Sequence, residues 1–228
     1  DSSYLAYKAK EYGLRPLVIH VDAGWNSELA VSNIENICKV LDYDLHTHVV
    51  DWEDMRDMQL AFLRSGVANQ DAPQDHAFFV ALYSFAVKNN IRYVLNGSNI
   101  ATESILPQSW GYNAMDSKFL QAIHRQFGTR KLTAYPTVSF WQYHFYYPYI
   151  RRMRVIRMLN YLHYNREKAK QLLIDKLGWK DYGAKHYESR FTKFFQGYFL
   201  PTRFGYDKRR AHLSSLVVSG QISRSDAL

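Results

Sequence analysis

Three short apolar runs in the first half of the chain constrain its fold more than any other feature. Residues 17–21, 45–50 and 92–95 are rich in Val, Ile and Leu, which is typical of strands buried on both faces of a parallel sheet. Between these runs, apolar residues recur at helical spacing. Because alternating strands and helices form right-handed β-α-β units, we predict an α/β fold with a doubly wound parallel sheet.

Polar residues and glycines mark the expected helix ends. Ser27 and Asp75 each precede an apolar helical segment and are predicted N-caps. Residues 116–127 and 166–177 are predicted helices, each followed by a glycine that ends it. A last strand is expected at 132–138.

The composition changes near residue 135. We expect a first domain at 1–135 and a helical, aromatic and basic C-terminal region at 136–228. Within that region Arg151, Arg154 and Arg157 recur every three residues, which predicts one basic helical face.

The charge balance indicates an anionic partner. The formal net charge is +8, which favours phosphates, nucleotides, nucleotide-sugars or RNA. The 18 Tyr and 5 Trp suggest flat surfaces that bind sugars, bases or proteins. No stretch approaches the roughly 18 apolar residues of a membrane-spanning helix, and we expect neither a signal peptide nor a membrane partner. The single cysteine, Cys38, excludes an internal disulfide and fits a reducing, cytoplasmic compartment.

Polar residues and glycines lie where three predicted strands end. The candidate nucleotide-binding residues are Asp1, Ser2, Ser3, Val21, Asp22, Ala23, Gly24, Gly97 and Ser98. Ligands of doubly wound sheets bind at the carboxyl ends of the strands, N–H groups at a helix start attract anions, and glycine lets a flat base approach the backbone. The alternatives are a simple N-cap at the start of the chain and plain turns at the two glycines.

Together these segments resemble the PP-loop (N-type) ATP pyrophosphatase superfamily. Its signature is a strand, then Ser-Gly-Gly-x-Asp-Ser and a helix, of which Asp1-Ser2 matches the end. The resemblance implies a Rossmann-like, adenine nucleotide alpha hydrolase-like fold whose first strand and loop start lie upstream of Asp1. It also implies ATP and Mg²⁺ as cofactors, with Ser2 at the pyrophosphate, Val21 to Gly24 at the adenine and Gly97 at the ribose and α-phosphate.

The C-terminal half resembles the N-acetyl sugar amidotransferases of lipopolysaccharide and flagellin-sugar biosynthesis, and the resemblance covers nearly the whole chain. The matching segments include Leu177-Gly178-Trp179, Lys185-His186-Tyr187-Glu188-Ser189, Phe204-Gly205-Tyr206-Asp207-Lys208-Arg209-Arg210 and Ser219-Gly220-Gln221. The implied reaction converts the acetamido group of a nucleotide-linked sugar to an acetamidino group through an adenylated imidate.

Side-chain chemistry suggests roles for the polar residues of these segments. The candidate catalytic residues are Lys208, Arg209, Arg210, His186 and Glu188, and the candidate substrate-binding residues are Lys185, Asn99 and Glu103. The three consecutive cations suit a developing charge at phosphate, although a solvated basic face is the alternative. The His and Glu suit substrate orientation or proton transfer, or form a local capping pair. Asp75 and His76 are further candidates for facing the nucleotide. No His or Cys spacing predicts a metal site.

The implied reaction needs ammonia, and we expect a separate glutaminase to supply it. Cys38 belongs to an apolar helical stripe and is predicted to be a core residue. In the family that the chain resembles, the partners are similar to the glutaminase and cyclase subunits of histidine biosynthesis. The aromatic segment 140–149 is a candidate docking face.

Two other functions fit parts of the sequence. A PP-loop enzyme that modifies tRNA, of the lysidine synthetase or thiolase type, would explain the net charge of +8 and the aromatic residues. A non-catalytic domain that binds adenine nucleotides would explain the alternating strands and helices, but not the basic C-terminal segment.

Overall fold

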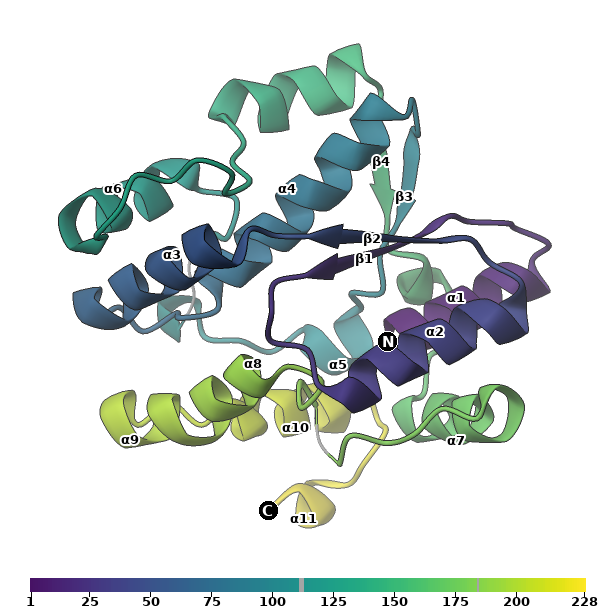
Figure 1. Cartoon of the computed structure of the whole chain (residues 1–228). Coiled ribbons are helices and arrows are strands. Elements are labelled where there is room, and N and C mark those ends of the chain that lie inside the picture. The colour runs from purple at the N-terminus through teal and green to yellow at the C-terminus, as the bar shows by residue number, and fades with distance from the viewer. Residues whose placement is uncertain (111–112, 184) are drawn as a thin grey trace.

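The computed structural model describes residues 1–110, 113–183 and 185–228. In the first half, helices and strands alternate as predicted: α1 (Ser2–Glu11), β1 (Val18–Asp22), α2 (Glu28–Leu41), β2 (Leu45–Val49), α3 (Trp52–Ser65), α4 (Ala72–Lys88), β3 (Tyr93–Leu95) and α5 (Ile100–Glu103). The described part of the second half is mainly helical: η1 (Gln108–Trp110), α6 (Ser117–Phe127), η2 (Gln142–Ile150), β4 (Arg154–Ile156), η3 (Met158–Tyr161), α7 (Arg166–Leu177), α8 (Arg190–Phe194), η4 (Phe195–Phe199), α9 (Leu200–Phe204), α10 (Lys208–Val218) and α11 (Arg224–Ala227). The protein is therefore mixed α/β with a helical C-terminal region (Figure 1).

The described strands form two parallel pairs. β1 pairs with β2, with Val18 opposite Leu45, and β3 pairs with β4, with Tyr93 opposite Arg154. Val18 and Leu95 pack against the same apolar cluster, so both pairs rest on a common core. The strands are parallel as predicted, but within the described residues they do not join into the single doubly wound sheet.

The predicted strand at 132–138 is a loop, because its backbone donors bind a carboxylate. The fully buried Asp54 on α3 accepts hydrogen bonds from the N–H groups of Thr133, Ala134 and Tyr135, at 2.7, 2.6 and 3.0 Å. Donors used in this way are not free to pair with a neighbouring strand. The last strand is instead β4, which follows residue 135 in the chain and pairs with β3 before it.

A second buried carboxylate, Asp57, holds the chain that follows α6. It accepts hydrogen bonds from the N–H and hydroxyl of Thr129 and the N–H of Arg130, and its Oδ2 lies 2.7 Å from His124 Nε2. Burial would raise the pKa of Asp57, but these hydrogen bonds outweigh it and lower the pKa to about 2.

The three arginines predicted to share a helical face do not share one. Arg151 follows η2, Arg154 begins β4, and Arg157 precedes η3. Between them Arg152 adopts a left-handed φ of +53°, which turns the chain out of η2 and into the strand.

Most predicted helix ends are confirmed. Ser27 Oγ accepts the Ala30 N–H at 3.2 Å at the start of α2. Gly128 and Gly178 follow the last residues of α6 and α7. These local signals need no tertiary contact, which is why the sequence predicts them well.

The apolar residues pack into cores between the helices. Met55, Met58, Phe62 and Leu120 are fully buried between α3 and α6, and a second core joins α1, α2 and α7. The C-terminal helices α8, α9 and α10 lie at one end of the molecule, and η2, the green helix above α4, lies at the other (Figure 1). Among the described residues, no helix is both long and apolar enough to cross a membrane.

Candidate active site

Ser2 and Gly97, which are far apart in the sequence, lie in contact. A Cβ atom on Gly97 would lie 2.7 Å from Ser2 Oγ and 2.8 Å from its backbone N, so only glycine permits this approach. Next to them, Ser3 is half-buried in α1 and the Ser98 N–H donates to Asn96 Oδ1 at 2.7 Å. The start of α1 and the loop after β3 therefore meet at the carboxyl end of a strand, where the sequence predicts phosphate binding.

Asp1 occupies the N-cap position of α1, but its carboxylate does not cap the helix. Its Oδ1 accepts a hydrogen bond from the Tyr164 hydroxyl at 2.5 Å. Only its backbone carbonyl bonds to the helix, through the Leu5 N–H at 3.0 Å. A simple N-cap function therefore does not account for this side chain.

The turn after β1 is closed by its own side chains. Asp22 Oδ1 accepts hydrogen bonds from the Gly24 N–H at 2.8 Å and from Asn26 Nδ2 at 3.0 Å. Gly24 has a φ of +82°, and a Cβ atom there would lie 2.7 Å from the Trp52 ring. The close approach that Gly24 permits is thus made by Trp52. The other predicted residues of this turn are the half-buried Val21 and the buried Ala23.

Residues 188–190 run alongside this turn. The Ser27 N–H donates to the Glu188 carbonyl at 2.9 Å, and the Arg190 N–H donates to the Trp25 carbonyl at 2.8 Å. The structure therefore brings Glu188, a predicted catalytic residue, to the carboxyl end of β1, beside the segment predicted to hold adenine.

Lys185 joins the C-terminal part to helix α5, which follows β3. Its Nζ lies 2.9 Å from Glu103 Oε1 and 3.5 Å from the Thr102 carbonyl. Burial lowers the pKa of Lys185, and the ion pair with Glu103 opposes that shift. The buried Asn99 caps α5 by accepting the Thr102 N–H at 3.0 Å. Two of the predicted substrate-binding residues thus bind each other, and the third holds the loop.

His186, Glu188 and His212 form a second polar group. His186 Nδ1 lies 3.7 Å from Glu188 Oε1, and the two imidazole rings are 5.6 Å apart. Burial would raise the pKa of Glu188, but the interaction with His186 outweighs it and the pKa is lowered. Burial and nearby cations, including Lys185 and Lys208, lower the pKa of His212 to about 3, so its ring is neutral near pH 7. Its buried Nε2 has no hydrogen-bond partner among the described residues.

Asp71 and Asp75 form an acidic pair at the start of α4. Asp75 is not the predicted N-cap, because α4 begins at Ala72 and Asp71 holds the cap position. The two carboxylates are one turn apart and therefore share a face of the helix. Asp71 is buried, and its Oδ1 accepts hydrogen bonds at 3.2 Å from Gln74 Nε2 and from the Thr192 hydroxyl.

The positive charge of Lys208 lowers the pKa of both carboxylates of this pair. Burial and the charge of Asp71 raise the pKa of Asp75 to about 7, against the opposing charge of Lys208. Burial also raises the pKa of Asp71, although Lys208 and a hydrogen bond from Gln196 oppose it. The pair therefore retains a proton near neutral pH, as a general acid or base requires.

These polar groups belong to one site. The Thr192 hydroxyl lies 3.2 Å from Asp71 Oδ1 and 3.1 Å from the hydroxyl of Ser189, which directly follows Glu188. The charges of Lys208 and His186 also act on the pKa of Asp71. Lys185 in turn contacts α5, directly after the loop that holds Gly97. The loop after β3, the C-terminal segment and the start of α4 thus surround a common polar region.

Asp75 is a candidate from the sequence, whereas Asp71 is identified only from the structure. The signal for the pair is two carboxylates at i, i+4 before an apolar helix. Such a spacing places like charges on one face, which destabilises a helix unless another group compensates. That compensation comes from Lys208, whose approach no local sequence pattern indicates.

The run of three cations is divided between the site and solvent. Successive residues at the start of α10 point about 100° apart around the helix. The Arg209 side chain is 83% exposed and pairs with Asp207 at 2.7 Å, and Arg210 is also exposed. Of the three, Lys208 is half-buried, and its charge lowers the pKa of both Asp71 and Asp75.

Among the described residues, the remaining titratable side chains offer neither a metal site nor an exposed thiol. Within the described ranges, no group of three or more His, Cys, Asp or Glu side chains is placed to hold a metal ion. Cys38 is buried on α2, and burial raises the pKa of its thiol. This environment disfavours a reactive thiolate.

Comparison with known families gives a match in the C-terminal part. Residues 188–228 match the family described as LPS biosynthesis protein WbpG-like, C-terminal domain. This segment begins at Glu188 and contains Lys208 and His212, so it supplies three side chains of the polar site. The match relates the chain to proteins of lipopolysaccharide biosynthesis. A search of curated proteins finds no match.

Proposed function

We propose that the protein is an ATP-dependent amidotransferase of surface polysaccharide or nonulosonic acid biosynthesis. It converts the acetamido group of a nucleotide-linked sugar to an acetamidino group, in the cytoplasm. One observation carries this proposal: the segment similar to lipopolysaccharide biosynthesis proteins packs back onto the carboxyl ends of the strands and completes a charged site there.

The contact between Ser2 and Gly97 supports the assignment of ATP. Backbone and hydroxyl donors at a helix start suit a phosphate group, and Gly97 lets the loop after β3 come directly against them. Mg²⁺ fits as a companion of the triphosphate, since Mg²⁺ commonly binds through substrate phosphates. The Asp71 carboxylate, already bonded to Gln74 and Thr192, does not suit a protein-held ion.

The proposed reaction has two steps. The amide oxygen of the acetamido group attacks the α-phosphorus of ATP, and pyrophosphate leaves with its bonding electrons. Ammonia then adds to the imidate carbon, the nitrogen loses a proton, and the C–O bond breaks to release AMP. The first step needs positive charge near the phosphates, and the second needs a proton acceptor.

The side chains of the site suit these needs. Lys185 and Lys208 provide positive charge, while the neutral His212 presents an unpaired ring nitrogen. The carboxylate of Asp75, whose pKa is raised to about 7 by burial and by Asp71, accepts the proton that leaves the ammonia nitrogen. In this proposal a partner glutaminase with a cyclase-like subunit supplies the ammonia.

The test is AMP formation by the full-length protein. The assay supplies ATP, Mg²⁺, ammonium and, one at a time, UDP- or CMP-linked acetamido sugars. We expect AMP and pyrophosphate to appear in equal amounts only with a matching sugar, and the sugar to lose one oxygen and gain one nitrogen. If none of the sugars in the panel leads to AMP formation, the proposal is wrong. Binding of AMP without pyrophosphate release would favour a non-catalytic nucleotide-binding domain.

A further inference from the structure

The end of the molecule that carries η2 has no acidic residues. It is built from the end of α4, β3, η2 and β4, which fall within residues 76–102 and 117–166. Neither range contains an Asp or a Glu, although the chain has 21. Arg92, Arg151, Arg152 and Arg154 lie in or directly beside these elements. Charge is therefore segregated, and this end carries an unbalanced positive field.

Three arginines at this end line a hollow, and none of them has an ion-pair partner among the described residues. Arg92, Arg152 and Arg154 line a cavity of about 460 Å³, with Tyr93 and Tyr149 beside them. All three arginines are exposed, and none is paired with a carboxylate among the described residues. Like charges held together in this way repel one another, and an anionic ligand relieves that repulsion.

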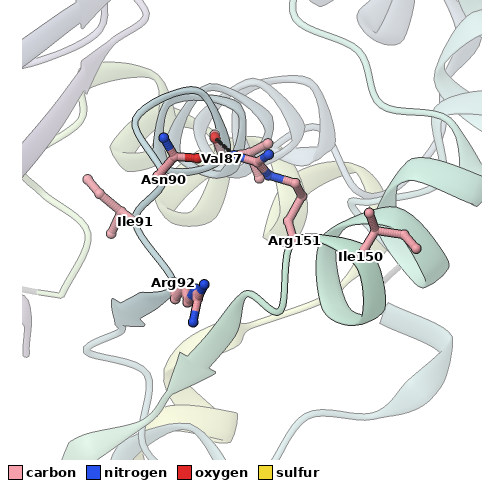
Figure 2. A pocket seen from close by; sticks show the side chains of 6 residues that line it. All are labelled: Val87, Asn90, Ile91, Arg92, Ile150 and Arg151. Carbon is pink, nitrogen blue, oxygen red and sulfur yellow. Dashed lines mark hydrogen bonds between the residues drawn. The ribbon is translucent and has the colours of Figure 1, made fainter.

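Two structural features fix the arginines in place. The Arg154 N–H donates to the Arg92 carbonyl at 2.7 Å, where β4 begins to pair with β3. Arg151 donates from its guanidinium to the Val87 carbonyl and to Asn90 Oδ1, at 2.6 and 2.5 Å, beside a second hollow (Figure 2). The basic surface is therefore built on paired strands and on the end of a long helix, and not on a free loop.

Helix η2 places large apolar side chains next to these arginines. Its outer side and its ends expose Phe140, Trp141, Phe145, Tyr146, Tyr149 and Ile150. Trp141 is 68% exposed and Tyr149 is 72% exposed. An apolar patch of this kind, bordered by charge, marks an interaction site on a soluble protein.

We propose that this arginine-aromatic face, formed by η2 and the starts of β3 and β4, docks the ammonia-supplying partner protein through an acidic surface of that partner. The proposal rests on the proposed function, which needs ammonia from elsewhere. Trp, Tyr and Arg dominate the energetic centres of protein interfaces, whereas Glu, Asp and Lys are depleted there. The absence of carboxylates on this face selects a partner of opposite charge.

The position of the face suits a partner. It lies where β3 and β4 begin, whereas Ser2 and Gly97 meet where β3 ends. A docked protein therefore leaves the proposed entry of ATP and sugar free. For the same reason, substitutions on the face leave the site itself unchanged, and ammonia-dependent activity serves as an internal control.

The experiment compares two sources of ammonia. Full-length protein is mixed with the purified glutaminase and cyclase-like subunits, and AMP formation is measured with glutamine and, separately, with ammonium. The variants are Arg92→Glu with Arg154→Glu, and Trp141→Ala. The control, Lys39→Glu with Lys176→Glu, makes the same change in charge on the exposed surfaces of α2 and α7.

We expect each face variant to weaken partner binding, measured by titration calorimetry, by about 10-fold or more. Glutamine-dependent activity then falls at limiting partner, while ammonium-dependent activity is unchanged. Rising salt weakens wild-type binding more than binding of the arginine variant. The control variant behaves like the wild type.

Two results overturn the proposal. One is unchanged partner binding and unchanged glutamine-dependent activity in both face variants. The other is a selective loss of binding to tRNA or to phosphatidylglycerol vesicles while partner binding persists, which assigns the face to those ligands. If the wild type forms no AMP from either nitrogen source, the proposed function fails, and calorimetry alone decides whether the face docks the partner.

Discussion

Replacing Gly97 with alanine tests whether the start of α1 and the loop after β3 form one phosphate-binding element. The added Cβ would lie 2.8 Å from the backbone N of Ser2 and 2.9 Å from its Cα. Ordinary contacts of a Cβ begin near 3.4 Å, so the two backbones must separate by at least about 0.5 Å. Such overpacking typically costs about 1–3 kcal/mol. Gly97 does not have a left-handed φ, so this cost comes from the contact alone.

The same separation displaces donors that would bind one phosphate group. Hydrogen bonds to a charged group contribute about 1.5–3 kcal/mol each, and about 1.4 kcal/mol is tenfold in affinity, so we expect Gly97→Ala to weaken ATP binding by about 10-fold or more. The matched control is Gly197→Ala in η4, where a Cβ meets nothing within 4 Å. Alanine there should stabilise the helix by up to about 1 kcal/mol.

The two variants are compared by urea unfolding, followed by tryptophan fluorescence, and by calorimetric titration of full-length protein with ATP. The reasoning is refuted if Gly97→Ala unfolds at the wild-type urea concentration and binds ATP with wild-type affinity. If Gly97→Ala is destabilised but binds ATP normally, the close contact is supported and its role in phosphate binding is contradicted.

The remaining predictions concern charged side chains. Asp57, whose pKa is about 2 in the folded protein, should contribute about 2 kcal/mol of stability above pH 4. This contribution is lost as the pH falls from about 4 to 2. Urea unfolding at several pH values should show this decrease in stability for the wild type but not for Asp57→Asn. Asp75 has a raised folded pKa, so its ionisation opposes folding increasingly between about pH 4 and 7. Asp75→Asn should therefore gain stability relative to the wild type as the pH rises through this window, while losing AMP formation at neutral pH. Lys208→Met should lower AMP formation by about 100-fold, whereas the exposed Arg210→Met should stay within about 2-fold; equal losses would contradict the separation of the two side chains.

Local signals in the sequence predict the elements of this fold well. The apolar runs give β1, β2 and β3 because Val, Ile and Leu favour strands. The strands are not buried on both faces, however, since β1 is half-buried throughout and Val49 of β2 and Tyr93 of β3 are exposed. Ser27, Gly128 and Gly178 mark helix ends because capping uses only neighbouring backbone groups. The strand predicted at 132–138 is wrong because a tertiary contact, and not a local one, sets the conformation of this segment. Its donors bind Asp54, which lies far away in the sequence.

The candidate site is predicted in part for the same reason. The sequence selects Ser2, Gly97 and Lys208 by residue type and resemblance, and the structure brings Ser2 to Gly97. The sequence gives no reason to prefer Lys208 to the neighbouring cation Arg209. In the structure, however, the helical rotation of α10 directs Arg209 to Asp207 and to solvent.

The sequence by itself determines the parallel α/β pattern, the basic charge and the segments where polar residues end strands, because these depend on side-chain type and spacing along one stretch of chain. Tertiary structure alone decides which of those segments meet. It buries Asp71 and Asp75 side by side, so that burial and mutual repulsion retain a proton that neither carboxylate would hold in water, against the opposing charge of Lys208. It also brings Arg92, just before β3, next to Arg154 at the start of β4. Both arginines lie in ranges of the chain, 76–102 and 117–166, that contain no Asp or Glu. Electrostatic interactions depend on distance in space, and distance in sequence does not specify it.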